Sequence, residues 1–140
     1  MALEIKTDCI GVDWLTVSET LKLVGMAHYA PEIHKKAFEA SHTTVFVYDG
    51  GRLIGFGRAI SDGAYQAAVY DVAVMPEFQK KGIGTVIMKN ILERLSPCNL
   101  ILYASPGKEE FYETLGFRKM LTGMALFKNA DGMKKKGFTK

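Results

Sequence analysis

The sequence predicts a single α/β domain with a mixed sheet, in which an antiparallel front half meets a back half of alternating strands and helices. Its length of 140 residues suits one domain. Two turn signals, Asp49-Gly50-Gly51 and Asp62-Gly63, separate three segments rich in β-branched and aromatic residues, as in an antiparallel meander. After Pro76, apolar residues at positions 87, 88, 91, 92 and 95 follow a helical period, which predicts a crossover to a parallel strand.

The elements of the front half follow from local patterns. Alternation over residues 2–7 predicts a first strand, and Val17, Leu21 and Val24 share one face of a helix over residues 16–26. A second short helix is expected over residues 31–40, because Pro31 suits a first helical turn. The meander is expected to consist of the strands 43–48, 52–60 and 65–75.

The back half alternates between helix and strand. We expect a helix over residues 85–95, a short central strand over 99–104, a second crossover helix over 108–115 and a final strand over 118–127. Gly116 ends the second of these helices. Because no repeat or linker interrupts the chain, we expect one domain over residues 1–140, with residues 133–140 forming a flexible basic tail.

Composition excludes several classes of protein. The net charge is +3, from 18 basic and 15 acidic residues, and four of the lysines lie in the tail, so a nucleic-acid partner is not expected. Neither a membrane span nor a signal peptide is apparent, which predicts a cytoplasmic protein without a membrane partner. Cys9 and Cys98 lie far apart, and the three histidines match no metal-ligand spacing, so we expect no metal.

Residues 79–85 form a glycine-containing loop between a strand and an amphipathic helix. Backbone N–H groups at a helix N-terminus are unpaired, and glycines there let a phosphate approach closely. A turn that merely starts the helix is the alternative. A Walker loop is excluded because no Gly-Lys-Ser/Thr follows, and Ile87 stands where a dinucleotide-binding loop needs a small residue.

Two motifs carry a family resemblance. The segment 71–84, DVAVMPEFQKKGIG, resembles the acetyl-CoA signature of the GCN5-related N-acetyltransferase (GNAT) family. The segment 111–117, FYETLGF, resembles the second motif of that family, at the right distance along the chain. Segments 52–58, 61–67 and 70–72 are similar to the subgroup that includes the plant-type serotonin (arylalkylamine) N-acetyltransferases.

The resemblance implies a V-shaped acetyl-CoA cleft between two splayed parallel strands, and a role for many residues. The backbone of Val72, Ala73 and Val74 would hold the pantetheine arm. The pyrophosphate would lie on the loop residues Gln79, Lys80, Lys81, Gly82, Ile83, Gly84 and Thr85. Lys80 and Lys81 could instead be only solvated, and Gln79 stands where the family often has Arg. Ser105, Lys108 and Phe111 complete the cofactor-binding residues that we expect.

The resemblance also implies direct acetyl transfer. Tyr112 would protonate the leaving thiolate, or it is only a packing aromatic. The family often places Glu or His at the positions of Ala68 and Tyr70, and this chain has neither there. Asp71 is the nearby carboxylate. A β-bulge could turn it toward Tyr70, so both are catalytic candidates, although Asp71 could also be purely structural.

The expected acceptor is a primary amine on an unidentified small molecule, such as an arylalkylamine, or on a peptide. Its pocket would be lined by Trp14, His28, Tyr29, Phe56, Tyr65 and Tyr70, each of which could instead be core. A non-catalytic acyl-CoA-binding module is the competing hypothesis, because the family's usual base is missing. Homodimers are frequent in the family, so a homodimer is a possibility.

Overall fold

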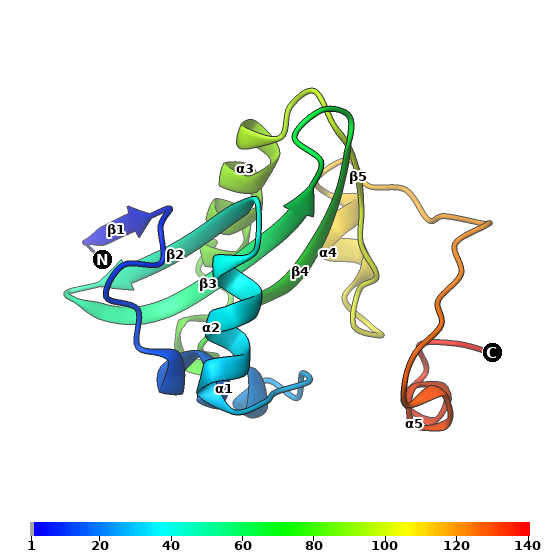
Figure 1. Ribbon diagram of the computed structural model, residues 1–140, viewed down its shortest axis with the longest axis horizontal. Coiled ribbons are helices and arrows are strands. Elements are labelled where there is room, and N and C mark those ends of the chain that lie inside the picture. The colour runs from blue at the N-terminus through cyan, green and yellow to red at the C-terminus, as the bar shows by residue number, and fades with distance from the viewer. Residues whose placement is uncertain (1) are drawn as a thin grey trace. The chain divides into compact units, whose positions relative to one another are not determined.

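The computed structural model describes residues 2–140, which divide into two compact units (Figure 1). The first unit extends to Leu102, and the second is Tyr103–Lys140. We describe each unit by itself.

The first unit contains a five-stranded mixed sheet, as the sequence predicts. Its strands are β1 (Leu3–Lys6), β2 (Thr43–Asp49), β3 (Arg52–Ser61), β4 (Gln66–Val74) and β5 (Asn99–Ile101). They are ordered β1-β2-β3-β4-β5, with the first four antiparallel and β5 parallel to β4. The helices are α1 (Trp14–Leu23), α2 (Pro31–Glu39), α3 (Ile83–Arg94) and the short 3-10 helix η1 (Pro76–Phe78).

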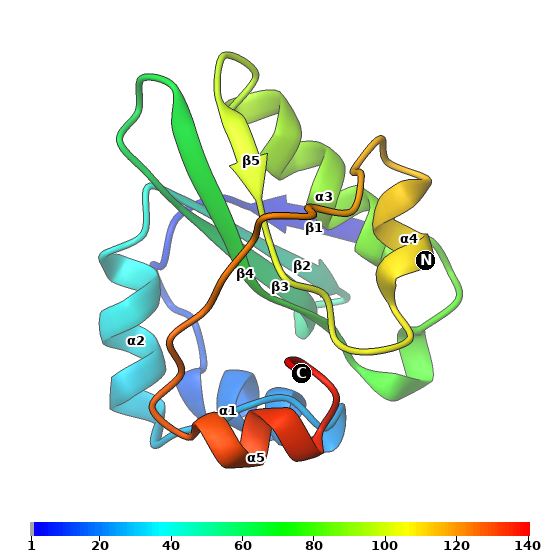
Figure 2. The same ribbon diagram turned by 90° about the vertical axis from the view of Figure 1, so that its right-hand side faces the viewer.

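Helices cover both faces of this sheet (Figures 1 and 2). On the α1–α2 face, the ring of Phe38 lies 5.6 Å from that of Phe46 and 5.9 Å from that of Phe56, and all three are fully buried. On the α3 face, a Cβ added at Gly57 would lie 2.9 Å from Cγ2 of Ile87. Only a glycine therefore lets α3 pack so closely against β3.

Helices α1 and α3 each begin two residues before the predicted start. Helix α1 begins at Trp14 since the Asp13 carboxylate accepts hydrogen bonds from the N–H groups of Leu15 and Thr16. It ends early because Gly25, at φ +78°, forms a left-handed turn in which the Met26 N–H donates to the Leu21 carbonyl. Helix α3 begins at residue 83, so Gly84 and Thr85 lie in its first turn.

Strand β5 corrects one prediction. It was expected over residues 99–104 in the centre of the sheet, but only Asn99–Ile101 are in the strand, and β5 is the edge strand of the described sheet. Its central position depended on a further strand over residues 118–127. A strand needs a partner for its backbone groups, and the structure places no strand there.

The second unit contains two short helices, α4 (Glu109–Glu113) and α5 (Ala130–Lys135). Residues 118–127, predicted to be a strand, are irregular and turn at 121–122. Their apolar side chains at Leu121, Met124 and Leu126 are almost fully exposed.

The C-terminal residues are more regular than the expected flexible tail. Residues 133–135 lie in α5, where the Asn129 side chain accepts a hydrogen bond from the Gly132 N–H. After α5, the ring of Phe138 packs 5.8 Å from that of Tyr103 and 6.5 Å from that of Phe127. An N-cap and an aromatic anchor together give this lysine-rich segment a defined conformation.

Candidate functional site

Strand β4 contains the bulge that the sequence suggests. Phe56 pairs with Ala73 and Arg58 pairs with Tyr70, so Gly57 alone lies opposite both Asp71 and Val72. The backbone of Asp71 has φ +56°, in the left-handed region that residues other than glycine rarely adopt. One extra residue in β4 therefore changes which side chains face α1 and α2.

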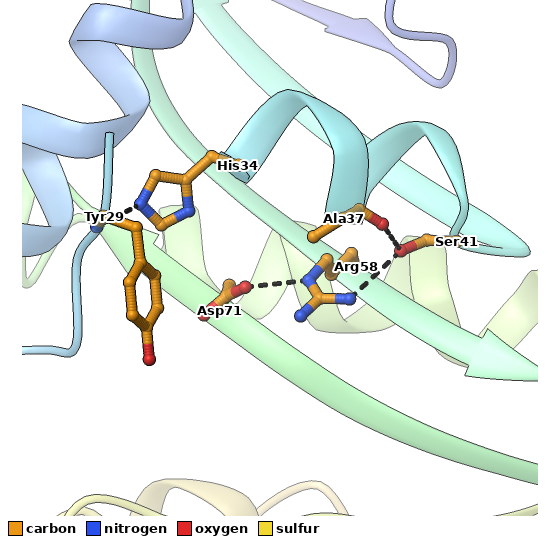
Figure 3. A network of polar contacts seen from close by, with 6 residues as sticks. All are labelled: Tyr29, His34, Ala37, Ser41, Arg58 and Asp71. Carbon is orange, nitrogen blue, oxygen red and sulfur yellow. Dashed lines mark hydrogen bonds and ion pairs between the residues drawn. The ribbon is translucent and has the colours of Figure 1, made fainter. Parts of the chain in front are cut away.

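The bulge brings Tyr70 and Asp71 to the same guanidinium group. In a regular strand these neighbours would face opposite sides of the sheet. Here the Arg58 Nε donates to Oδ2 of Asp71 at 2.7 Å, and the Arg58 Cζ lies 5.4 Å from the centre of the Tyr70 ring. Figure 3 shows the ion pair between the two strands.

Arg58 is held on several sides. Its Cζ lies 5.6 Å from the centre of the Phe38 ring, and its Nη1 donates to Ser41 Oγ at 3.3 Å. The Ser41 hydroxyl in turn donates to the Ala37 carbonyl at 2.7 Å, which ties the guanidinium to the end of α2 (Figure 3). Arg58 was missed by the sequence reasoning. The available signal was Arg58 as the one charged residue in the segment 53–61, since a charge among apolar residues needs a partner.

His34 lies near this pair and fixes the segment between α1 and α2. Its Nε2 accepts a hydrogen bond from the Tyr29 N–H at 2.9 Å, while the Tyr29 carbonyl accepts one from the Ser18 hydroxyl at 2.6 Å. Burial lowers the pKa of His34; the charge of Asp71 acts against this shift and that of Arg58 adds to it. Because Nε2 is an acceptor, the buried imidazole is neutral and carries its proton on Nδ1.

The far end of β4 has an open edge. β4 pairs with β5 only over Gln66–Ala68, and within the described residues β5 does not extend along the rest of β4 (Figure 2). Val72, Ala73 and Val74, the residues expected to hold pantetheine, lie in that part of β4. The Gln79 side chain donates to the Val74 carbonyl at 3.0 Å, which ties the following loop back to the strand end.

The glycine-containing loop leads directly into α3. Lys80 has φ +62°, and Gly82, the N-cap of α3, has φ +82°. No side chain caps this helix, and a Cβ added at Gly82 would have no atom within 4 Å. The first-turn amides of α3, including those of Gly84 and Thr85, therefore have no side-chain acceptor at the N-cap. The Lys81 ammonium lies 5.5 Å from the centre of the Phe78 ring.

The remaining expected site residues lie in the second unit. The Ser105 carbonyl accepts a hydrogen bond from the Lys108 N–H at 2.9 Å, and Lys108 is the N-cap of α4. The Tyr112 ring lies 5.0 Å from that of Phe111 and 5.9 Å from that of Phe117. Burial raises the pKa of the Tyr112 phenol, so it stays protonated at neutral pH.

The aromatic residues expected to line an acceptor pocket do not form one group. Trp14 packs against Phe38 and Phe46 in the core, and Phe56 is fully buried there. Tyr65 is exposed in the turn before β4. Trp14 and Phe56 thus pack as core residues, the alternative that the sequence left open.

The sequence profile of the acetyltransferase (GNAT) domain matches residues 17–129. The chain belongs to this family.

Solved GNAT structures agree in fold. A probable acetyltransferase from Staphylococcus aureus superimposes with a TM-score of 0.79 at 25% identity, covering 90% of this chain and 99% of its own. A GNAT protein from Streptococcus pneumoniae gives a TM-score of 0.77 at 26% identity, covering 91% and 99%. The predicted family and fold class are confirmed.

The named relatives in sequence are longer proteins. An uncharacterized N-acetyltransferase ycf52 from Porphyra purpurea is 32% identical over 83% of this chain and 64% of its own length. The rice protein named serotonin N-acetyltransferase 2, chloroplastic, is 31% identical over 89% of this chain and 68% of its own length. Both names agree with the prediction of an acyltransferase.

No group of three or more His, Cys, Asp or Glu side chains in residues 2–140 could hold a metal ion. None of the helices in this range is long and apolar enough to cross a membrane.

Proposed function

We propose that the protein is an N-acetyltransferase that transfers the acetyl group of acetyl-CoA directly to a primary amine. The observation that carries the proposal is the succession of two features along the chain. The open edge of β4 at Val72–Val74 is followed, after η1, by the uncapped N-terminus of α3. These features offer backbone groups first to an extended arm and then to a pyrophosphate, in the order in which CoA carries them.

The described residues fit CoA on chemical grounds. A pantetheine arm is an extended chain with two amides, so it can pair with the open edge as an added strand would. The pyrophosphate would accept hydrogen bonds from the first-turn amides of α3, where the helix dipole also favours an anion. Lys80 and Lys81 add positive charge, while Gln79 holds the loop through the Val74 carbonyl.

Acetyl transfer requires a neutral amine, a hydrogen-bond donor for the oxyanion and an acid for the leaving thiolate. The amine attacks the thioester carbon and forms the new C–N bond, the carbonyl oxygen becomes an oxyanion, and the C–S bond then breaks. We assign the oxyanion donor to the backbone N–H of Val72 behind the bulge. We assign the proton for the leaving thiolate to the Tyr112 phenol, which burial keeps protonated.

The proton of the amine needs a different acceptor. Positions 68 and 70 carry Ala and Tyr, so the bases common in the family are absent. Asp71 is engaged through Oδ2 with Arg58. We propose that water at the bulge removes this proton, and that Tyr70 and Asp71 border the place where the amine enters.

The test is thiol release from acetyl-CoA with a panel of amines. Serotonin and tyramine come first because a relative is named for serotonin, followed by a polyamine and a peptide with a free N-terminus. We expect Tyr112→Phe to lower kcat about 10- to 100-fold with little change in acetyl-CoA affinity. Tyr48→Phe is the matched control, since burial also raises the pKa of Tyr48, which lies in β2. Equal rates for Tyr112→Phe and wild type would remove Tyr112 from the mechanism.

A non-catalytic acyl-CoA-binding module is the second candidate. The missing base at positions 68 and 70 and the engagement of Asp71 favour it. Acetyl-CoA binding without thiol release for any amine of the panel would support this module over the enzyme.

The acceptor, the location and the oligomeric state remain proposals. We propose an arylalkylamine-like acceptor, which the name of the rice relative supports. We place the protein in the cytoplasm from its sequence, although the rice relative and an Arabidopsis thaliana relative are named chloroplastic. We also propose a homodimer, which light scattering would detect as twice the mass of the single chain.

A further inference from the structure

We propose that Arg58 is a positioning residue for acetyl transfer, because its guanidinium holds Asp71 in the left-handed conformation on which the β4 bulge depends. The inference rests on the proposed function. It explains what keeps the amides behind the bulge in place, and it gives Asp71 a role other than that of a base.

The bulge needs something to hold it. At φ +56°, Asp71 adopts a backbone conformation that costs energy for every residue with a Cβ and costs a glycine nothing. Gly57 lies opposite Asp71 and Val72, so the regular ladder between β3 and β4 is interrupted at this point. Removing the bulge would shift β4 by one residue against β3 on one side, so a contact that needs Asp71 in this conformation favours the bulged register.

The ion pair supplies that preference. The 2.7 Å bond from Arg58 Nε to Asp71 Oδ2 joins the two strands at the interruption, next to the paired residues Arg58 and Tyr70. The two side chains point toward one another beside α2 (Figure 3), whereas a regular continuation of β4 after Tyr70 would turn Asp71 to the opposite face. Side-chain exposures of 14% for Arg58 and 21% for Asp71 mean that water screens the pair weakly.

Arg58 is itself held by contacts on several sides. The rings of Phe38 and Tyr70 lie near its Cζ, and Ser41 accepts from its Nη1. A lysine could not bond Asp71 and Ser41 together in this way, since its ammonium lacks the planar fork. The chain thus presents a fixed cation to Asp71, and Asp71 fixes the backbone that continues into Val72.

Two matched double variants test whether the ion pair only fixes the backbone at residue 71 or whether the Asp71 carboxylate takes part in the reaction. Arg58→Met with Asp71→Gly removes the pair but lets residue 71 adopt positive φ freely. Arg58→Met with Asp71→Ala removes the pair and keeps the cost of a Cβ. Both double variants avoid leaving one partner charged and unpaired in a half-buried place. They differ by a single methyl group.

Hydrogen exchange of residues 70–74 and thiol release with serotonin as the probe amine are measured for each variant. We expect Arg58→Met to speed exchange in this segment but not over residues 43–49, and to lower kcat about 10-fold or more while KM for acetyl-CoA changes less. The Gly double variant should have a kcat at least about threefold higher, and slower exchange at residues 70–74, than the Ala double variant, because only the glycine adopts positive φ without strain.

Several outcomes would overturn the proposal. Equal losses in the Gly and Ala double variants would mean that the Asp71 carboxylate acts chemically. Unchanged hydrogen exchange at residues 70–74 in Arg58→Met would show that Arg58 does not hold the backbone at the bulge. If Arg58→Met fails to fold, the comparison of the two double variants, which leave no unpaired charge, decides the proposal. A wild type without thiol release for any amine would contradict the proposed function, while the exchange data would still decide whether Arg58 holds the bulge.

Discussion

Strand β3 carries two arginines that form the same kind of contact in different surroundings. Arg52 donates two hydrogen bonds to Glu77, at 2.9 and 3.2 Å, and its Cζ lies 5.5 Å from the Phe78 ring centre. Arg58 bonds Asp71 through one nitrogen and also lies near aromatic rings. The Arg52 pair has the better fork geometry, but its side chains are 51% and 59% exposed, against 14% and 21% for Arg58 and Asp71.

The comparison teaches that burial, more than the number of hydrogen bonds, decides how much stability is lost when an ion pair is removed. An exposed pair loses as much hydration and side-chain freedom as it gains in attraction. In a half-buried pair, removal of one partner leaves the other charge poorly solvated, so the loss is large. The exposed pair joins β3 to η1, just before the glycine-containing loop, whereas the half-buried pair lies at the bulge.

The largest expected effect on stability is that of Arg58→Met. It leaves the Asp71 carboxylate half-buried without its partner, and we expect the free energy of unfolding to fall by about 2–3 kcal/mol. Urea denaturation measures this value. A loss below about 0.5 kcal/mol, the usual range for a surface site, would erase the contrast between the two arginines.

Gly57→Ala tests the residue opposite the bulge. The added Cβ would lie 2.9 Å from Cγ2 of Ile87 and 3.1 Å from Cγ2 of Val72, both of which belong to packed side chains. We expect a loss of about 1–2 kcal/mol from overpacking, measured by urea denaturation. A higher free energy of unfolding for Gly57→Ala than for the wild type would contradict this. It would mean that α3 and the bulge move apart to make room for the added methyl group without loss.

The pH dependence of stability tests the surroundings of the half-buried pair. Because burial lowers the pKa of His34 in the folded protein, the unfolded chain binds a proton first as the pH falls below about 6.5. Stability from His34 is therefore complete above this pH and declines below it, by at most about 1.4 kcal/mol per pH unit.

Thermal denaturation between pH 7.5 and pH 5.5 measures this decline. His34→Gln can still accept from the Tyr29 N–H but does not titrate, so its stability should vary less over this range. His42→Gln, at an exposed position, is the control and should keep the wild-type slope. If His34→Gln also keeps it, the decline has another source.

The smallest effect is expected from Arg52→Met. Its pair is exposed, so the free energy of unfolding should change by no more than about 0.5 kcal/mol, and less in high salt. The same urea titrations provide the measurement. A loss as large as that of Arg58→Met would show that geometry, and not burial, sets the strength of these pairs.

Much of the first unit was predictable because its signals are local. The turns at Asp49-Gly50-Gly51 and Asp62-Gly63 define the meander, and the spacing of Ile87, Met88 and Ile91 defines α3. The motif that contains Gly82 and Gly84 likewise gave the loop and the family. Each of these features depends on residues that are neighbours in the sequence.

The features that sequence reasoning missed depend on pairing. The contact between Arg58 and Asp71 requires the register of β3 against β4, and residues 13 positions apart carry no local signal for it. The segment 118–127 has the composition of a strand, but pattern alone does not supply a partner for it. For Trp14 the sequence left the core and a pocket open, because an aromatic on a helix suits both, and only its packing against Phe38 and Phe46 places it in the core.

The most direct test of the proposed acetyl-CoA site is a thermal-shift titration with acetyl-CoA, CoA, ATP and NAD side by side. We predict that acetyl-CoA and CoA stabilise the protein, by about 2.7 kcal/mol at 100 times the dissociation constant, and that ATP and NAD do not. Gly84→Val, which places a branched side chain in the first turn of α3, should remain folded and lose the shift. No shift with either CoA species, or a full shift in folded Gly84→Val, would contradict the site and with it the proposed function.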